Sequence, residues 1–308
     1  MRPHIHTLTC NLLWEKTLTF SSWEAGRTQR ALTESFQGGG KGINVSKMLT
    51  RLGVPNTAVF LPGGATGTDC EQWVRAQGVV CRTFPVATPT RVGIVVRAPG
   101  RPETTFLGPD VPPDAAAVRA CAEYVDGLPA GDLLAVCGSL PGWNTEVFEP
   151  LRAAFSRWQP RGLTVADTYG PALAWLIERP LEWVKVNRAE FETLFTGKYP
   201  PLSMPERLAA AMARWAPKAW IVTDGPRPVW FAERGSPPTS VVPPVVAEVS
   251  ATGSGDVLHA CLLDAVFHCG HPLAVALRLA LPYAAANAAQ GTVADFSFAN
   301  LPDFRSAG

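Results

Sequence analysis

The second half of the chain alternates short apolar runs with longer amphipathic stretches. Apolar runs at residues 133–137, 163–166, 183–186 and 219–222 predict strands, and the stretches between them predict helices. Strands that alternate with helices favour a parallel sheet with helices on both faces. The pattern therefore predicts an α/β fold of three layers, α/β/α, around a mainly parallel central sheet.

The first part of the chain follows a less regular pattern. Residues 17–34 mix Thr, Phe, Trp and Arg without a helical period, which indicates strands of a small sheet. A helix is predicted from residue 43 to a stop at Gly53. The other predicted elements are strands over 5–13, 57–61 and 79–84, a helix over 66–77, and a hairpin formed by 91–97 and 103–107.

Polar residues or glycines follow the four regular strands. These residues are Gly138 with Ser139, Asp167, Asn187 and Thr223. Any one of them could simply belong to a polar loop. Because parallel sheets bind ligands beyond the carboxyl ends of their strands, four such positions in register indicate a binding edge.

The composition limits the classes of protein to which the chain can belong, but it does not point to a reaction. Of the 308 residues 47% are hydrophobic and 17% are charged, which is typical of a globular protein with a sizeable core. A net charge of +1 gives no argument for a nucleic acid or a membrane surface as partner, and we expect neither. No apolar run has the length of a membrane span or of a signal peptide's apolar region, so we expect a cytoplasmic protein. Seven cysteines without a Cys-x-x-Cys pair indicate buried thiols.

One stretch near the C-terminal end carries candidate chemistry. Residues 250–256 (SATGSGD) run directly into the apolar segment 257–267. Glycines at a helix start expose backbone N–H groups, and the helix dipole adds positive charge there, so this stretch is suited to an anion. Asp256 could be an ordinary first-turn carboxylate that stabilises the helix, or a general base beside a bound phosphate.

Two glycine-rich signatures, GGKGINV at residues 39–45 and TGSGD at 252–256, resemble those of the ribokinase-like carbohydrate kinases. Further markers fall in order between them: GSLPG at 138–142, VKVNRAE at 184–190 and VTDG at 222–225. The lysine of the first signature resembles the 1-phosphofructokinase and tagatose-6-phosphate kinase branch, often called phosphofructokinase B. The resemblance covers essentially the whole chain. It implies one kinase domain over residues 1–308, with a small β-sheet lid from about 12–36 and 85–108.

The resemblance also implies a mechanism. Asp256 would take a proton from a sugar hydroxyl that attacks the γ-phosphate of ATP, while the N–H groups of residues 253–255 would bind the developing charge. The positions implied for this phosphate site are Gly253, Ser254 and Gly255, and those implied for ATP are Asn187, Thr223, Gly225 and Asn287. Glu190, with Asn187, would hold Mg²⁺ directly or through water. A monovalent cation could also be required.

On the substrate side, the resemblance assigns Lys41 and Arg91 to a phosphate group that the substrate already carries. The other positions implied for substrate binding are Glu15, Gly39, Gly40, Asn44 and Ser139. Glu15 stands where the branch usually has the aspartate of Asn-Pro-Ala-Leu-Asp. The lid element usually written Glu-x-Asn-x-x-Gly-Pro is interpreted as residues 104–109, shortened and without its polar groups.

We therefore expect ATP-dependent phosphorylation of a phosphorylated ketohexose or a similar sugar phosphate. Two alternatives stay open: a kinase of a non-phosphorylated sugar or nucleoside, and a non-catalytic protein that binds a sugar phosphate or nucleotide. Without the resemblance, Glu190 and Asn287 could equally be surface residues of their helices. Apolar side chains in the lid segments would suit a homodimer formed through the lid, or they could cover the lid's own core.

Overall fold

The largest element is a mainly parallel sheet. The computed structural model describes residues 2–195 and 202–305, and within them this sheet has nine strands in the order β13-β12-β11-β10-β9-β8-β1-β4-β5. Its pairs from β11 to β5 are parallel, and β12 and β13 add an antiparallel edge. The strands are β1 (Ile5–Thr9), β4 (Asn56–Phe60), β5 (Cys81–Thr83), β8 (Leu133–Cys137), β9 (Leu163–Asp167), β10 (Trp183–Asn187), β11 (Ala219–Asp224), β12 (Arg227–Glu233) and β13 (Thr239–Val241).

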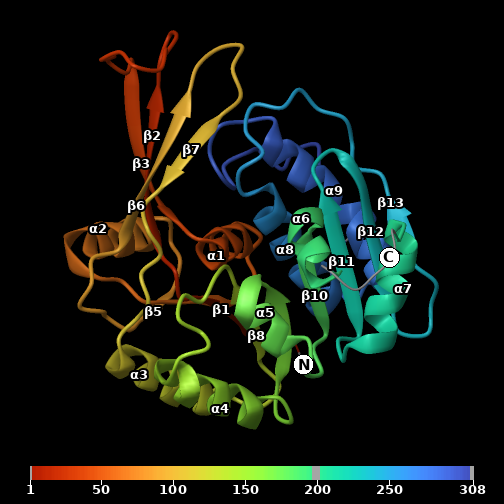
Figure 1. Ribbon diagram of the computed structural model, residues 1–308. Helices are drawn as coiled ribbons and strands as arrows, with labels where there is room; N and C mark the ends of the chain where they lie inside the picture. Colours follow the sequence, from red (N-terminus) through yellow and green to blue (C-terminus); the bar gives the residue numbers. More distant parts are fainter. Residues whose placement is uncertain (1, 196–201, 306–308) are drawn as a thin grey trace.

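Helices cover both faces of this sheet (Figure 1). One face carries α3 (Ala115–Asp126), α4 (Glu149–Trp158), α5 (Gly170–Leu176), α6 (Arg188–Glu192) and α7 (Met204–Arg214). The other carries α1 (Lys41–Arg51), α2 (Gly64–Ala76), α8 (Ser254–Leu263) and α9 (Leu273–Ala288). Short turns of helix are η1 (Glu146–Phe148), η2 (Thr193–Phe195) and the π-helical η3 (Asp264–His268). The predicted three-layer α/β/α fold is confirmed.

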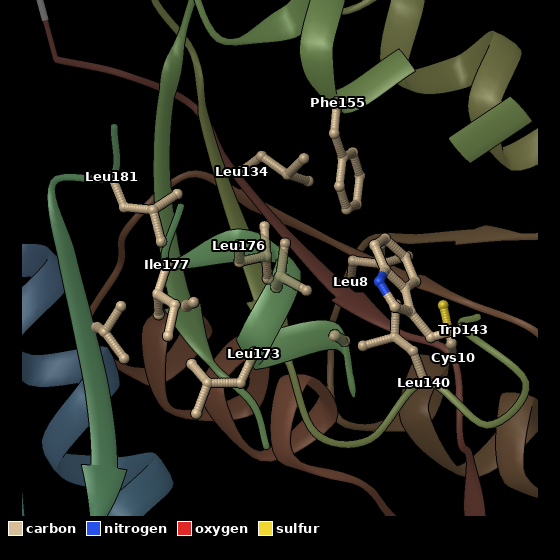
Figure 2. Close-up of a cluster of buried hydrophobic side chains, with 14 of the residues drawn as sticks. Leu8, Cys10, Leu134, Leu140, Trp143, Phe155, Leu173, Leu176, Ile177 and Leu181 are labelled. Carbon is tan, nitrogen blue, oxygen red and sulfur yellow. The ribbon is translucent and has the colours of Figure 1, made fainter. Parts of the chain in front are cut away.

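The core under α3, α4 and α5 is built from aliphatic and aromatic side chains of strands and helices. Figure 2 shows Leu8 and Leu134 from the sheet, Phe155 from α4, Leu176 from α5, and Trp143 among them. All of them are at most 2% exposed. Burial of such large apolar side chains from both layers is the main force that holds helices to the sheet.

A second sheet stands apart from the first (Figure 1). Its order is β3-β2-β6-β7, from the strands β2 (Leu13–Thr19), β3 (Thr33–Gly39), β6 (Arg91–Arg97) and β7 (Thr104–Leu107). Along β2 the side chains of Leu13, Glu15 and Thr17 are buried, while the residues between them are partly exposed. The small sheet thus has an inner face toward the rest of the protein and an outer face toward solvent. The boundaries and closing motion of a lid stay a prediction.

Several predicted elements need correction. The strand over 5–13 is wrong, because β1 ends at Thr9 and the chain crosses to the small sheet before β2 begins at Leu13. The strands over 17–34 are wrong for residues 20–32, which have no regular strand. The antiparallel edge strands β12 and β13 were not predicted. In the described parts of the chain, no helix combines the length and apolar character needed to cross a membrane.

Candidate active site

The polar strand ends of the predicted binding edge lie at one edge of the large sheet. Parallel pairing puts Cys137 opposite Asp167 and Asn187 opposite Thr223, whereas Val184 pairs with Ala166, so β10 and β11 extend about two residues beyond β8 and β9 at the same edge. The N-termini of α1 and α8 belong to two helices that pack against each other on this sheet. The two glycine-rich signatures, far apart in the sequence, therefore meet at one place.

The turn before α8 depends on glycine and on a buried asparagine. Gly253 is the N-cap of α8 with φ 73°, and a Cβ atom there would lie 2.4 Å from Cγ1 of Val293. Asn287 donates hydrogen bonds of 3.0 Å to the carbonyl of Thr252 and 3.0 Å to Oγ of Ser254. Asn287 is 1% exposed, so it supports the turn from behind, and it is absent from the lining of the cavities described below.

Asp256 lies in the first turn of α8 and is 7% exposed. Its Oδ2 accepts a hydrogen bond of 2.7 Å from Nδ2 of Asn44, which comes from the first turn of α1. Burial, followed by the nearby negative charge of Asp167, raises the pKa of Asp256 to about 6. A carboxylate with such a pKa is ionised at neutral pH and still basic enough to accept a proton from a reacting hydroxyl.

Asp167 is a buried acid to which the sequence analysis gave a place at the binding edge but no role. Its Oδ1 lies 2.8 Å from Nζ of Lys41, and its Oδ2 lies 2.7 Å from Nζ of Lys185. Burial alone would raise the pKa of Asp167, but the two ammonium groups outweigh it and hold that pKa well below its ordinary value. Lys41 also lies 3.3 Å from Oε1 of Glu190, so its charge is shared between two carboxylates.

Two cavities meet at this cluster. The large cavity, of about 510 Å³, is lined by the predicted nucleotide residues Asn187, Thr223, Gly225, Gly253 and Gly255, by Ser254 of the predicted phosphate site, and by apolar side chains of α9 and of the segment 243–246. The small cavity, of about 240 Å³, is lined by the predicted substrate residues Glu15, Gly40, Lys41, Asn44, Arg91 and Ser139. Lys41, Gly253 and Asp256 line both. Gly39 ends β3 beside the small cavity without lining it.

Asn187 and Glu190 form a capping box at the start of α6. Oδ1 of Asn187 accepts a 2.8 Å hydrogen bond from the N–H of Glu190, and Oε2 of Glu190 accepts one of 2.9 Å from the N–H of Asn187. Within residues 2–195 and 202–305, no group of three acidic, histidine or cysteine side chains could enclose a metal ion. One carboxylate and one amide still fit Mg²⁺, which keeps several waters and takes further oxygens from phosphates.

Arg91 lies where the small cavity meets the end of β6, and it already has an anionic partner. Its Nη1 lies 2.8 Å from Oδ1 of Asp110, which also accepts a 2.7 Å hydrogen bond from Nδ2 of Asn11. The same amide of Asn11 donates a 2.7 Å hydrogen bond to Oγ of Ser139. Arg91 and Asn11 thus both contact the carboxylate of Asp110, and Ser139 is joined to this group through Asn11.

The lid element is longer than predicted. Glu103 directly precedes β7 and, counted from it, Glu-x-Asn-x-x-Gly-Pro is complete to Pro109, with Thr105 in place of the asparagine. Its interpretation as a shortened element was therefore wrong. Oε1 of Glu103 accepts a 2.7 Å hydrogen bond from Oγ1 of Thr252, and its Oε2 lies 2.6 Å from Nε of Arg97. The hairpin of the small sheet is thereby tied to the glycine turn before α8.

The residues that the prediction missed left different signals. Lys185 interrupts the apolar strand β10, and a charge in a buried strand requires a buried partner. Asp167 was recognised only as a polar strand end, although its position beside β10 in the sheet makes it that partner. Asp110 and Glu103 lie in irregular segments, where the sequence pattern carries no direction for a side chain.

Comparisons with known proteins agree with this geometry. The family model described as pfkB family carbohydrate kinase matches residues 8–297. The 1-phosphofructokinase of Rhodobacter capsulatus is 29% identical over 289 residues, which cover 92% of this chain and 90% of the relative. The ATP-dependent 6-phosphofructokinase isozyme 2 of Escherichia coli is 29% identical over 260 residues, 82% of each chain. The solved structure of phosphofructokinase-2 from Escherichia coli in complex with potassium superposes with a TM-score of 0.85 at 23% identity and 96% coverage of both chains.

Proposed function

The chain belongs to the pfkB family of carbohydrate kinases, and on this premise we propose that it transfers the γ-phosphoryl group of ATP to a hydroxyl group of a phosphorylated ketohexose or a similar sugar phosphate. The observation that carries the proposal is the position of Asp256. It lines both cavities at the N-terminus of α8, where a base could reach a hydroxyl in one cavity and the glycine turn could face a phosphate in the other. Relatives named 1-phosphofructokinase and 6-phosphofructokinase support a substrate that already carries a phosphate.

ATP would occupy the large cavity. Apolar residues Ala284, Ala285 and Ala288 of α9 line one part of it and suit a flat base, while Lys185 and the N–H groups of residues 253–255 suit phosphates at the other end. Glu190 and Asn187 would hold Mg²⁺, which would supply positive charge beside the phosphates. The potassium in the Escherichia coli structure supports a monovalent cation as a further requirement.

The sugar phosphate would occupy the small cavity. Asn44 and Glu15 would contact its hydroxyl groups, and Arg91 with Ser139 would bind its phosphate. Lys41 lines the same cavity between Asp167 and Glu190, where its charge would face the substrate phosphate or the group in transfer. Burial raises the pKa of Glu15 above its ordinary value.

One observation favours the second candidate, a kinase of a sugar without a phosphate. Asp110 already neutralises Arg91, so the receptor for a substrate phosphate is occupied by a carboxylate of the chain itself. A neutral sugar would not need to displace it. A non-catalytic binding protein is disfavoured, because the buried base and the glycine turn stand together at the junction of the cavities.

An assay of ATP turnover separates these candidates. The acceptors to compare are fructose 1-phosphate, fructose 6-phosphate, tagatose 6-phosphate, fructose and adenosine. We expect a phosphorylated ketohexose to give the largest kcat/KM. Asp256→Asn should lower kcat by about 100-fold or more, since it removes the base. Asp264→Asn is the matched control, because Asp264 is another buried carboxylate, 1% exposed, that lines neither cavity. Turnover that needs no phosphate on the sugar, or that survives Asp256→Asn, contradicts the proposal.

The outer face of the small sheet supports a homodimer formed through it. Register places Trp14, Phe36, Val92, Ile94 and Phe106 on this face, with Lys16 between Phe36 and Ile94. Phe106 is 57% and Phe36 is 42% exposed. An exposed apolar patch on adjacent strands suits a second copy of the same sheet, which would cover it with an identical patch.

A further inference from the structure

A buried histidine lies directly behind the site. His259 follows Asp256 by about one turn of α8, is 0% exposed and lines neither cavity. Its Nε2 lies 3.2 Å from Nε1 of Trp183. Its Nδ1 has no hydrogen-bond partner among the described residues, and the acceptor it faces is Oδ2 of Asp167 at 3.5 Å, so the two interact as charge and dipole across a long contact. The imidazole therefore stands between an indole and a carboxylate, in the core rather than in a cavity.

The indole fixes the tautomer of this imidazole. The ring nitrogen of tryptophan can only donate, so the Nε2 atom of His259 must be the acceptor and carries no proton. Burial lowers the pKa of His259, which leaves a neutral ring with a single proton. That proton must be on Nδ1, the atom that faces Asp167. A tautomer with its proton on Nε2 would set two donors against each other and turn a lone pair toward the carboxylate.

Asp167 in turn places two cations. Its two oxygens hold Nζ of Lys41 at 2.8 Å and Nζ of Lys185 at 2.7 Å, and His259 shares Oδ2 with Lys185. The ammonium of Lys185 lies 3.2 Å from the point where a Cβ of Gly255 would be, so it stands against the glycine turn at one end of the large cavity. A rotation of the Asp167 carboxylate would move both ammonium groups.

From this chain of contacts we infer that His259 is a positioning residue: its Nδ1–H, oriented by Trp183, holds the Asp167 carboxylate in the orientation that keeps Lys185 and Lys41 at the phosphate end of the nucleotide cavity. The inference rests on the proposed function, because it takes the large cavity as the place of ATP. His259 would touch neither substrate and would act only through Asp167.

Two substitutions at this one position separate the donor from the acceptor. In His259→Asn the amide nitrogen can take the place of Nδ1 and donate to Asp167, whereas in His259→Gln the longer side chain places its amide near Nε2 and can serve only Trp183. If the inference is correct, kcat and ADP affinity fall about tenfold in His259→Gln and are restored several-fold toward wild type in His259→Asn. Equal values in the two variants, or the opposite order, would overturn it.

A binding readout distinguishes positioning from packing. Adenosine has no phosphate, so its affinity should stay within about twofold in both variants while that of ADP separates them. His6→Gln is the control for loss of a buried imidazole, because His6 is 5% exposed and bonds to Asp132 and Tyr124 away from both cavities. It should lower the melting temperature without separating ADP from adenosine. Parallel losses of both ligands in the His259 variants would assign His259 a packing role only.

The wild-type protein provides a test that does not depend on a variant that folds. Nitrogen-15 NMR of labelled histidine should show His259 protonated on Nδ1 and unprotonated on Nε2 at neutral pH, and Trp183→Phe should release this preference. A proton on Nε2 in the wild-type protein would refute the inference. A wild-type chain that binds no ADP would instead refute the proposed function, and the tautomer measurement would still decide whether the indole orients His259.

Discussion

The pairing of Arg91 with Asp110 makes a prediction of unusual sign: removing a charged side chain should improve substrate binding. Asp110 is 55% exposed in its side chain, whereas Arg91 is only 13% exposed. Among the described residues, no group accepts the Nε–H of Arg91. A substrate phosphate that binds Arg91 must first displace the carboxylate of Asp110, so this carboxylate is an internal competitor.

The size of the effect follows from the exposure of the pair. An ion pair with one half-exposed partner contributes about 0.2–1 kcal/mol. Since about 1.4 kcal/mol corresponds to a factor of ten, release of Arg91 should lower KM for the sugar phosphate about 1.5- to 5-fold. Asp110→Asn keeps the shape and the hydrogen bond to Asn11, and Asp110→Ala removes both. The alanine variant should therefore show the larger decrease.

The assay compares KM for the best sugar phosphate with KM for ATP at constant ionic strength. We expect KM for ATP to stay within about 1.5-fold, because Asp110 does not line the large cavity. Asp126→Asn, which breaks an ion pair between the C-terminal end of α3 and Arg157 of α4, is the control for loss of one surface carboxylate. An increase in KM for the sugar phosphate would mean that Asp110 contacts the sugar. An unchanged KM would mean that Arg91 does not bind the substrate phosphate.

Three further predictions concern the base, the glycine turn and the small sheet. Activity should fall as the pH drops through about 6, where Asp256 becomes protonated. Lys41→Met removes a cation that lowers the pKa of Asp256, so this acidic fall in activity should move to higher pH, and an unchanged pH–rate profile contradicts the prediction. Gly253→Ala should lower kcat and the melting temperature, because the added Cβ would collide with Val293. Val293→Ala in the same chain should restore part of both losses, and no recovery would show that the left-handed backbone at position 253 alone causes them. Phe106→Asp should convert a dimer to a monomer in light scattering, and a chain that is monomeric before the substitution refutes the dimer.

The sequence predicted the large sheet well because its central strands are buried on both faces. An unbroken apolar run such as β8 is hard to place anywhere else. The same property misled the prediction over residues 5–13, where β1 and the start of β2 are both buried but in different sheets. β12 contains Pro228 and alternates less clearly, and its place is decided by antiparallel pairing with β11. The local pattern of apolar and polar residues does not show which strands pair with each other.

For the site, the sequence named candidate side chains, most of which line the two cavities, but it did not indicate their partners. Lys41 was expected near a substrate phosphate, yet its neighbours Asp167 and Glu190 are 126 and 149 positions away in the chain. Only the packing of α1 on the sheet brings them together. His259 gave no signal, since one histidine in an apolar helix is more often an ordinary core residue, and its chemistry depends on Trp183 from another element.

The charges at the junction of the cavities explain why Asp256 is the member of this cluster that can accept a proton. Asp167, Glu190 and Asp256 carry three negative charges when ionised, against two positive charges on Lys41 and Lys185. Lys41 pairs with Asp167 and Glu190, and Lys185 pairs with Asp167, whereas the hydrogen-bond donor to Asp256 among the described residues is the neutral amide of Asn44. Uptake of a proton by Asp256 brings the cluster to two charges of each sign, which is the balance that a buried site favours. The cation pairs that lower the pKa of Asp167 therefore leave Asp256 as the acid with the raised pKa. Under the proposed function, the glycine turn, a bound Mg²⁺ and a released Arg91 would then be the groups that bind the incoming phosphate.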